Sequence, residues 1–152
     1  MAKMKIIDYG FVGDNRTNVR IYTEEGGMIT AKRCPTEKPL YCTRDGHFFS
    51  LTKFGLREVK PCFAVPRDHR VCHTRYPFMR QFENRTCHML MALTWIGPMP
   101  AGHVVDHING NILDYSAANL EWVTPKENIR RAKILRALRA GSRDPKQMSR
   151  NK

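Results

Sequence analysis

Two short stretches near the C-terminal end decide the local fold of this chain: HVVDHINGN, residues 103–111, and NLEWVTPKEN, residues 119–128. The first predicts a strand over residues 104–108 that ends in an Asn-Gly turn. The second predicts a strand over residues 120–123 that leads into a helix. Thr124 suits the N-cap, Pro125 suits the first helical position, and Glu127 is placed to complete a capping box. We therefore expect strand, loop, strand and helix in direct succession.

The helix after Pro125 is expected to continue to Gly141, a natural stop. Its predicted apolar seam consists of Ile129, Ala132, Leu135 and Leu138. The other faces carry basic side chains, and we expect the following to bind DNA: Lys126, Arg130, Arg131, Lys133, Arg136 and Arg139. Residues 142–152 are expected to form a flexible basic tail.

A second helix is predicted before these stretches. Apolar residues recur at helical spacing from Cys87 to Trp95, and Gly97-Pro98 ends the pattern. Because His88 lies on this apolar stripe, we expect a packed, hydrogen-bonded core histidine rather than a metal ligand. Upstream, residues 1–80 predict β structure, with strand candidates at residues 6–9, 18–22 and 28–31 and a hairpin over residues 41–51.

The fold class is therefore α+β, in three regions: a β-rich, DNA-contacting region at 1–80, a hairpin-and-helix module with its preceding helix at 81–141, and the tail at 142–152. Basic residues on the N-terminal strands could lie against DNA. They could equally be the polar face of any exposed sheet, and the sequence leaves both interpretations open.

The charge of the chain predicts a polyanionic partner. There are 26 Lys and Arg against 14 Asp and Glu, a formal net charge of +12, which is typical of nucleic-acid binding. Ten basic and two acidic residues lie within residues 125–152. The alternative is a solvated basic tail that only keeps the protein in solution.

The composition indicates where in the cell the protein is expected and whether a structural metal is expected. No apolar run approaches the ~18 residues of a membrane span, and the first residues lack the apolar segment of a secretory signal. A cytoplasmic protein is expected, in a bacterial host cell if a phage encodes it. The five cysteines include no CxxC pair, so free buried thiols are expected. A zinc site built on Cys62, Cys72 and His73 matches no common spacing, and structural zinc is not expected.

The residues of the two stretches fit the hydrolysis of a phosphodiester. One carboxylate, Asp106, and one amide oxygen, Asn128, would suit Mg²⁺ or Mn²⁺. His107 is the expected general base, because a neutral imidazole accepts a proton from water near neutral pH. Neighbours in a regular strand point to opposite faces, so we expect a loop or bulge at the Asn-Gly turn to turn His107 toward the phosphate. Asn119 is assigned to holding the loop and orienting His107.

These motifs resemble the HNH (ββα-metal) nuclease superfamily, most closely its small phage and intron-encoded homing endonucleases. The resemblance covers residues 86–132 and rests on Asp-His-Ile-Asn-Gly-Asn at 106–111 and Asn-Leu-Glu-Trp-Val-Thr-Pro-Lys-Glu-Asn at 119–128. It implies Asp106 and Asn128 as metal ligands, His107 as general base and Asn119 as the loop-fixing residue. Relatives with histidine at the distal position bind transition metals, so Asn128 favours magnesium or manganese.

The expected function is a metal-dependent endonuclease that nicks one strand of double-stranded DNA and acts as a monomer. A DNA-binding or packaging accessory protein with a catalytically silent HNH fold is the main alternative. A zinc-stabilised RNA-binding protein is a third.

Overall fold

The computed structural model describes residues 3–63 and 76–141. Its N-terminal part is a six-stranded antiparallel sheet whose strands follow one another in sequence order. They are β1 (Ile6–Val12), β2 (Asn18–Thr23), β3 (Met28–Arg33), β4 (Leu40–Cys42), β5 (Phe48–Thr52) and β6 (Gly55–Val59). Buried residues alternate along β2, which is the two-residue period of a strand with one covered face.

A smaller sheet and a helix link this part to the C-terminal hairpin. The sheet contains β7 (Cys62–Phe63), β8 (Pro77–Met79) and β9 (Arg85–Thr86). Helix α1 (Cys87–Met91) follows directly and continues as a π-helical turn (Ala92–Ile96), which ends at Gly97 with a φ of 130°. The helix predicted over Cys87–Trp95 is therefore present, and glycine ends it as expected.

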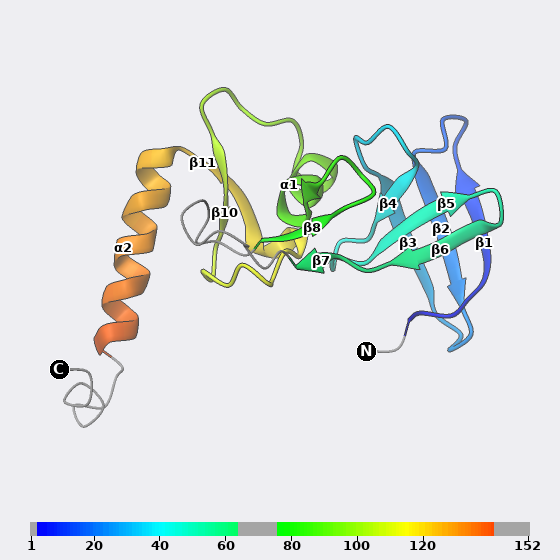
Figure 1. Ribbon diagram of the computed structural model, residues 1–152, viewed down its shortest axis with the longest axis horizontal. Coiled ribbons are helices and arrows are strands. Elements are labelled where there is room, and N and C mark those ends of the chain that lie inside the picture. The colour runs from blue at the N-terminus through cyan, green and yellow to red at the C-terminus, as the bar shows by residue number, and fades with distance from the viewer. Residues whose placement is uncertain (1–2, 64–75, 142–152) are drawn as a thin grey trace.

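The C-terminal part contains the predicted hairpin and helix. β10 (Val104–His107) pairs antiparallel with β11 (Leu120–Val123), and a short 3-10 helix (Ala117–Asn119) precedes β11. Helix α2 (Pro125–Gly141) follows. Figure 1 shows the six-stranded sheet at one end of the molecule, α2 at the other, and α1 with the hairpin between them. This mixture of helix and sheet agrees with the expected α+β class.

Two hydrophobic cores hold the described parts together. One lies within the N-terminal sheet and contains Val19, Ile21, Ala31, Tyr41, Phe49 and Leu56. The other joins the sheet, α1 and the hairpin, and includes Leu40, Cys42, Phe48, Cys87, Leu90, Met91 and Leu120. Because this second core takes residues from both sides of residue 80, it fixes the position of α1 and of the hairpin against the N-terminal sheet.

The thiols of Cys34, Cys42 and Cys87 are free and buried, as expected, and the free thiol of Cys62 is half-buried. Burial raises the pKa of Cys87 to about 12, so this thiol stays protonated and inert. Cys72 and His73 lie outside the described residues. No helix in the described part of the chain is both long and apolar enough to cross a bilayer.

Helix α2 begins as predicted but packs differently. The Glu127 amide donates to the Thr124 hydroxyl at 3.3 Å, which confirms Thr124 as the N-cap. The Glu127 carboxylate pairs with Arg130 and Arg131, and no bond back to Thr124 completes the predicted capping box within the described residues.

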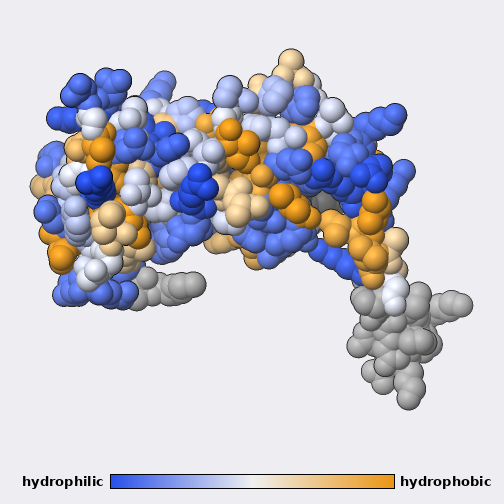
Figure 2. Space-filling view, turned by 180° about the vertical axis from the view of Figure 1, so that it is seen from behind, coloured by the Kyte–Doolittle hydropathy of each residue, from blue (hydrophilic) through white to orange (hydrophobic). Residues whose placement is uncertain are grey.

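The predicted apolar seam of α2 is wrong for Ile129 and Leu138, although Ala132 and Leu135 do lie half-buried on the face toward the hairpin. Ile129 is 57% exposed and Leu138 is 65% exposed, and apolar surface lies open along this helix in Figure 2. The face toward the hairpin instead carries Asn128, Arg131, Ala132 and Leu135, all half-buried. The physical reason is that α2 contacts the molecule along a narrow strip in which the ion pairs of Arg131 lie beside only two apolar side chains, Ala132 and Leu135.

Gly110 allows α2 to lie close to the hairpin loop. Its φ is 72°, and an added Cβ would lie 2.8 Å from the Leu135 Cδ1 atom and 3.2 Å from an Arg139 nitrogen. We expect Gly110→Ala to lower the free energy of unfolding by about 1–3 kcal/mol, because it combines left-handed strain with a steric clash. Urea unfolding measures the change.

Gly13→Ala is the matched control for this prediction. Gly13 has a φ of 81°, but nothing lies within 4 Å of its added Cβ. Backbone strain without the clash should cost about 1 kcal/mol. Equal losses in the two variants would mean that the ends of the Leu135 and Arg139 side chains move aside at no cost.

Candidate active site

The register of the β10–β11 hairpin decides which side chains share a face. Residues 104 to 107 pair in order with residues 123 to 120, without a bulge. Side chains of a regular strand alternate between faces. Asp106 therefore faces α2, and His107 faces α1. The expectation that a loop or bulge turns His107 to the side of Asp106 is wrong, because regular pairing continues through His107.

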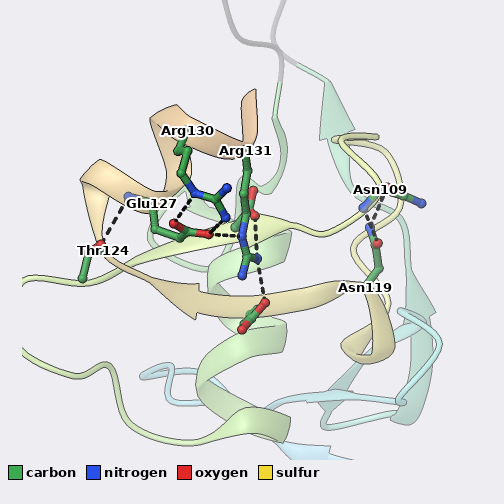
Figure 3. Close-up of polar contacts among 8 residues, drawn as sticks. Asn109, Asn119, Thr124, Glu127, Arg130 and Arg131 are labelled. Carbon is green, nitrogen blue, oxygen red and sulfur yellow. Dashed lines mark hydrogen bonds and ion pairs between the residues drawn. The ribbon is translucent and has the colours of Figure 1, made fainter. Parts of the chain in front are cut away.

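On the α2 face, Arg131 connects three carboxylates. Its guanidinium lies 3.2 Å from Asp106, 2.7 Å from Glu121 and 2.9 Å from Glu127. Asp106 and Glu121 are directly opposite in the hairpin, where two like charges repel each other. Figure 3 shows Arg131 extending from α2 over the hairpin, beside Glu127. Hydrogen bonds to Glu121, Glu127 and Asp106 raise the pKa of Arg131, so this side chain stays charged and offsets part of the negative charge of the face.

Asn128 lies in the first turn of α2, where its backbone N–H donates to the Thr124 backbone carbonyl at 2.9 Å. It is half-buried and precedes Arg131 by three residues, so both project from the same helix face. Because Arg131 contacts Asp106, the Asn128 side chain belongs to the helix face that is turned toward β10. Asp106 and Asn128 thus come from the two elements between which the predicted ion would lie.

The donor chemistry of this face fits a hard divalent cation. Carboxylate and amide oxygens are ligands that Mg²⁺ accepts while it keeps several waters. A positive group already lies against Asp106, since the Arg131 guanidinium acts there as a stand-in cation. Within residues 3–63 and 76–141, no group of three or more His, Cys, Asp or Glu side chains could hold a metal. A ligand pair of one carboxylate and one amide does not require such a group.

His107 lies on the other face of the hairpin and is 6% exposed. Its ring centroid is 5.1 Å from that of His88 in α1 and 5.9 Å from that of Tyr76, with which it stacks at 13°. Burial lowers the pKa of His107, while the charges of Asp106 and Asp114 act in the opposite direction. The imidazole is therefore neutral at pH 7, the protonation state that a general base needs.

His88 is packed as expected, but one of its two ring nitrogens lacks the expected hydrogen bond. Its Nδ1 atom is buried and has no hydrogen-bond partner among the described residues. Burial, followed by the charge of His107, lowers the pKa of His88 to about 4. His88 is thus a neutral imidazole in contact with the candidate general base.

Asn119 closes the loop between the two strands and is 8% exposed. Its Oδ1 atom accepts from the Asn109 backbone amide at 3.0 Å, and its Nδ2 atom donates to Asn109 Oδ1 at 2.9 Å (Figure 3). The Nδ2 atom also donates to the Asp114 carbonyl at 2.8 Å. Three bonds from one buried side chain fix the backbone directly after His107. This geometry supports the loop-holding assignment, and the assigned effect on His107 stays a prediction.

Replacing Asn119 by alanine should lower the free energy of unfolding by about 1–3 kcal/mol, because the Asn109 backbone amide, the Asn109 side-chain oxygen and the Asp114 carbonyl each lose a hydrogen-bond partner that is buried. Thermal unfolding measures this change. The matched control is Asn111→Ala in the same loop, because Asn111 is exposed and its side chain accepts one bond, from the Leu113 amide. If both variants unfolded alike, the bonds of Asn119 would not hold the loop.

The predicted DNA-binding residues divide into two groups. Arg130 pairs with Glu127 at 2.7 Å, and Arg131 is held by its three carboxylates. Lys126, Lys133 and Arg136 are exposed and form no ion pair with another described residue. The side chain of Arg139 lies near the Gly110 loop. Lys126, Lys133 and Arg136 are therefore more available for phosphate contacts than Arg130 and Arg131.

Sequence reasoning missed three residues of this site. Asp114 accepts hydrogen bonds from Asn109 and Ser116, and its Asp-x-Ser spacing could have signalled a turn. Glu121 shares Arg131 with Asp106, a relation that the predicted strand pairing could have suggested. Tyr76 packs against both histidines, and nothing in its local sequence indicates this contact.

An antiparallel hairpin with an acid and an imidazole, followed by a helix with an amide in its first turn, is the arrangement expected from the resemblance to the ββα-metal class. Comparison with known proteins agrees: the family model described as HNH endonuclease matches residues 85–130. Residues 85–130 therefore match the HNH endonuclease family, which confirms the resemblance expected from the sequence.

Two curated relatives carry the same module. YosQ, a prophage-derived protein of Bacillus subtilis (strain 168) that is named as an HNH homing endonuclease, is 34% identical over 92 residues, 60% of this chain and 51% of its own length. L247 of Acanthamoeba polyphaga mimivirus, named as an HNH endonuclease, is 44% identical over 52 residues, 33% of this chain and 13% of its own length. The chain thus spans about half the length of YosQ and much less of L247.

Among solved structures, the HNH homing endonuclease I-HmuI is similar over 73% of this chain and 58% of its own. The TM-score is 0.46, and the sequence identity is 22%.

Proposed function

We propose that this chain is a divalent-metal-dependent endonuclease of the homing or phage type, which hydrolyses one strand of double-stranded DNA per site and acts as a monomer. The observation that carries the proposal is the placement of Asp106, His107, Asn119 and Asn128 on a single hairpin and the first turn of the next helix. The family match over residues 85–130 supports it.

Asp106 and Asn128 are the residues that would hold Mg²⁺ or Mn²⁺. When bound, such an ion would neutralise charge on the scissile phosphate and stabilise the leaving oxygen. Asn128 contributes an uncharged oxygen, so the pair adds one negative charge to the site. Arg131 must release Asp106 at least in part for the carboxylate to act as a ligand, and Glu121 and Glu127 remain as its partners.

His107 would accept the proton of the attacking water. Its Nε2 atom is buried on the side of α1, so we assign the acceptor role to Nδ1. Asn119 would keep the loop after His107 in place through its three bonds, and thereby limit the movement of the imidazole. Neutral His107 can take the proton without first losing one of its own.

DNA would be held by the cationic surface of α2, together with the basic N-terminal sheet. Replacing Lys133 and Arg136 together by alanine should weaken DNA binding and reduce the slope of log K against log salt by about 2, because each lost phosphate contact removes about one released counterion. Fluorescence anisotropy over a salt series measures this slope.

A charge-matched control is Lys5→Ala combined with Lys60→Ala. These lysines are ion-paired with Glu24 and Glu58 in the N-terminal part. The control should leave the salt slope unchanged. An equal reduction in both double variants would mean that net charge, and not the surface of α2, determines affinity.

A DNA-binding protein with a catalytically silent HNH fold is the second candidate. The enclosure of His107, at 6% exposure, is the observation that favours it. Supercoiled plasmid should become nicked by the wild-type protein with Mg²⁺ and stay intact with EDTA. Binding without nicking in Mg²⁺ and in Mn²⁺ would establish the silent protein instead.

A further inference from the structure

We propose that His88 is a positioning residue for His107: the two imidazoles share an N–H···N hydrogen bond that fixes which ring nitrogen of His107 is free to accept a proton. The inference rests on the proposed function, because it concerns how the proposed general base is oriented. It starts from two buried polar atoms, His88 Nδ1 and His107 Nε2, neither of which has a hydrogen-bond partner among the described residues.

The rings lie at the separation that such a bond requires. Their centroids are 5.1 Å apart, and their planes are inclined at 65°. Two imidazoles joined by an N–H···N bond of about 3 Å, with one ring radius added on each side, have centroids about 5 Å apart. The centroid separation therefore permits such a bond once the two orphaned nitrogens face each other.

The surroundings restrict both rings to this arrangement. Cys87, Leu90 and Met91 are fully buried and anchor α1, so the backbone at His88 cannot withdraw from the hairpin. His107 is anchored by regular strand pairing with Leu120. Tyr76 packs on both rings, with its centroid 4.6 Å from His88 and 5.9 Å from His107. The aromatic cluster of Tyr76, His88 and His107 leaves the two nitrogens few other directions.

The chemical consequence concerns the tautomer of His107. A neutral imidazole carries one N–H, and the partner of that N–H determines which tautomer is present. If Nε2 of His107 donates to Nδ1 of His88, the lone pair of His107 lies on Nδ1. This is the atom that remains for the attacking water. His88 would then carry its own proton on Nε2 and would not exchange protons with substrate.

The tautomer of His107 can be measured directly in the metal-free protein, without any nuclease assay. Long-range ¹H–¹⁵N correlation spectra of the full chain with ¹⁵N-labelled histidine distinguish the protonated ring nitrogen from the free one. The His107 signals are identified by their absence in His107→Gln. We expect the wild-type protein to show His107 protonated on Nε2 with Nδ1 free.

Two variants of His88 separate hydrogen bonding from packing. His88→Phe keeps an aromatic ring but has no acceptor, and it should give a mixture of His107 tautomers. His88→Gln offers an amide oxygen to Nε2–H and should restore the wild-type tautomer. His103→Phe is the matched control, because His103 is only half-buried and its ring contacts the Ala101 carbonyl rather than His107, so its loss should leave the His107 signals unchanged.

Plasmid nicking by the same variants connects the bond to catalysis. Loss of a group that orients a catalytic residue typically costs 10- to 100-fold. We therefore expect kcat to fall by about 10- to 100-fold in His88→Phe, with KM unchanged, and to recover in part in His88→Gln.

Wild-type His107 protonated on Nδ1, or the wild-type tautomer retained in His88→Phe, would overturn the proposal. If His88→Phe does not fold, the spectra of the wild-type protein and of His88→Gln still decide it. If the tautomer responds as expected while the wild-type protein nicks no plasmid, the proposed function fails and the catalytic role of His88 fails with it, although the bond itself stands.

Discussion

Replacing His107 by alanine should lower the rate of plasmid nicking by about 10²- to 10⁴-fold, the usual contribution of a general base. DNA affinity should not change, because His107 lies on the α1 face of the hairpin and the unpaired cations of α2 lie elsewhere. Single-turnover nicking of supercoiled plasmid measures the rate, and a gel shift in EDTA measures binding.

His107 is buried, so the alanine variant also leaves a cavity beside His88 and Tyr76. His107→Gln is the second variant, because it fills more of the space and still cannot act as a base near neutral pH. His103→Ala controls for loss of a histidine at a half-buried position directly before β10. Full nicking activity in a folded His107→Gln protein would exclude His107 as the base.

Replacing Asp106 by alanine should abolish Mg²⁺-dependent nicking, with a loss of about 1000-fold. Charge neutralisation by a bound cation is worth several kcal/mol in the transition state, and each 1.36 kcal/mol corresponds to a factor of ten. Asn128 would be left as the single protein ligand of the proposed pair. Nicking over a Mg²⁺ series, and Mn²⁺ binding followed by electron paramagnetic resonance, measure the change.

Glu121→Ala is the matched control for Asp106. It removes a carboxylate from the same face of the hairpin and from the same arginine, since Glu121 lies opposite Asp106 and 2.7 Å from Arg131. We expect this variant to keep Mn²⁺ binding and most of its nicking activity. Equal losses in the two variants would mean that the total negative charge of the cluster matters, and that Asp106 has no special role as a ligand.

The elements around the candidate site could be predicted from sequence because their signals are local. Thr124 and Pro125 define the start of α2 through hydrogen bonding and a fixed φ, which do not depend on the rest of the fold. The hairpin follows from two short apolar runs around an Asn-Gly turn, and the helix over residues 87–96 follows from its spacing and from Gly97.

The errors concern relations between elements. The apolar seam of α2 was predicted from periodicity, but Ile129 and Leu138 are exposed because Arg131 turns a polar strip of the helix toward the hairpin. The orientation of His107 was predicted from what the chemistry needs, whereas pairing with Leu120 keeps it on the regular face. The contact between His107 and His88 joins residues 19 positions apart, and no local pattern encodes it.

The ion pairs of Arg131 have a consequence for the protein before it meets any partner. Asp106, Glu121 and Glu127 converge on one guanidinium, so the hairpin and α2 carry an internal counter-ion for their acidic groups. The apoprotein can thus bring these groups together during folding without a cation from solution, and an approaching polyanion meets a face whose negative charge is already partly offset.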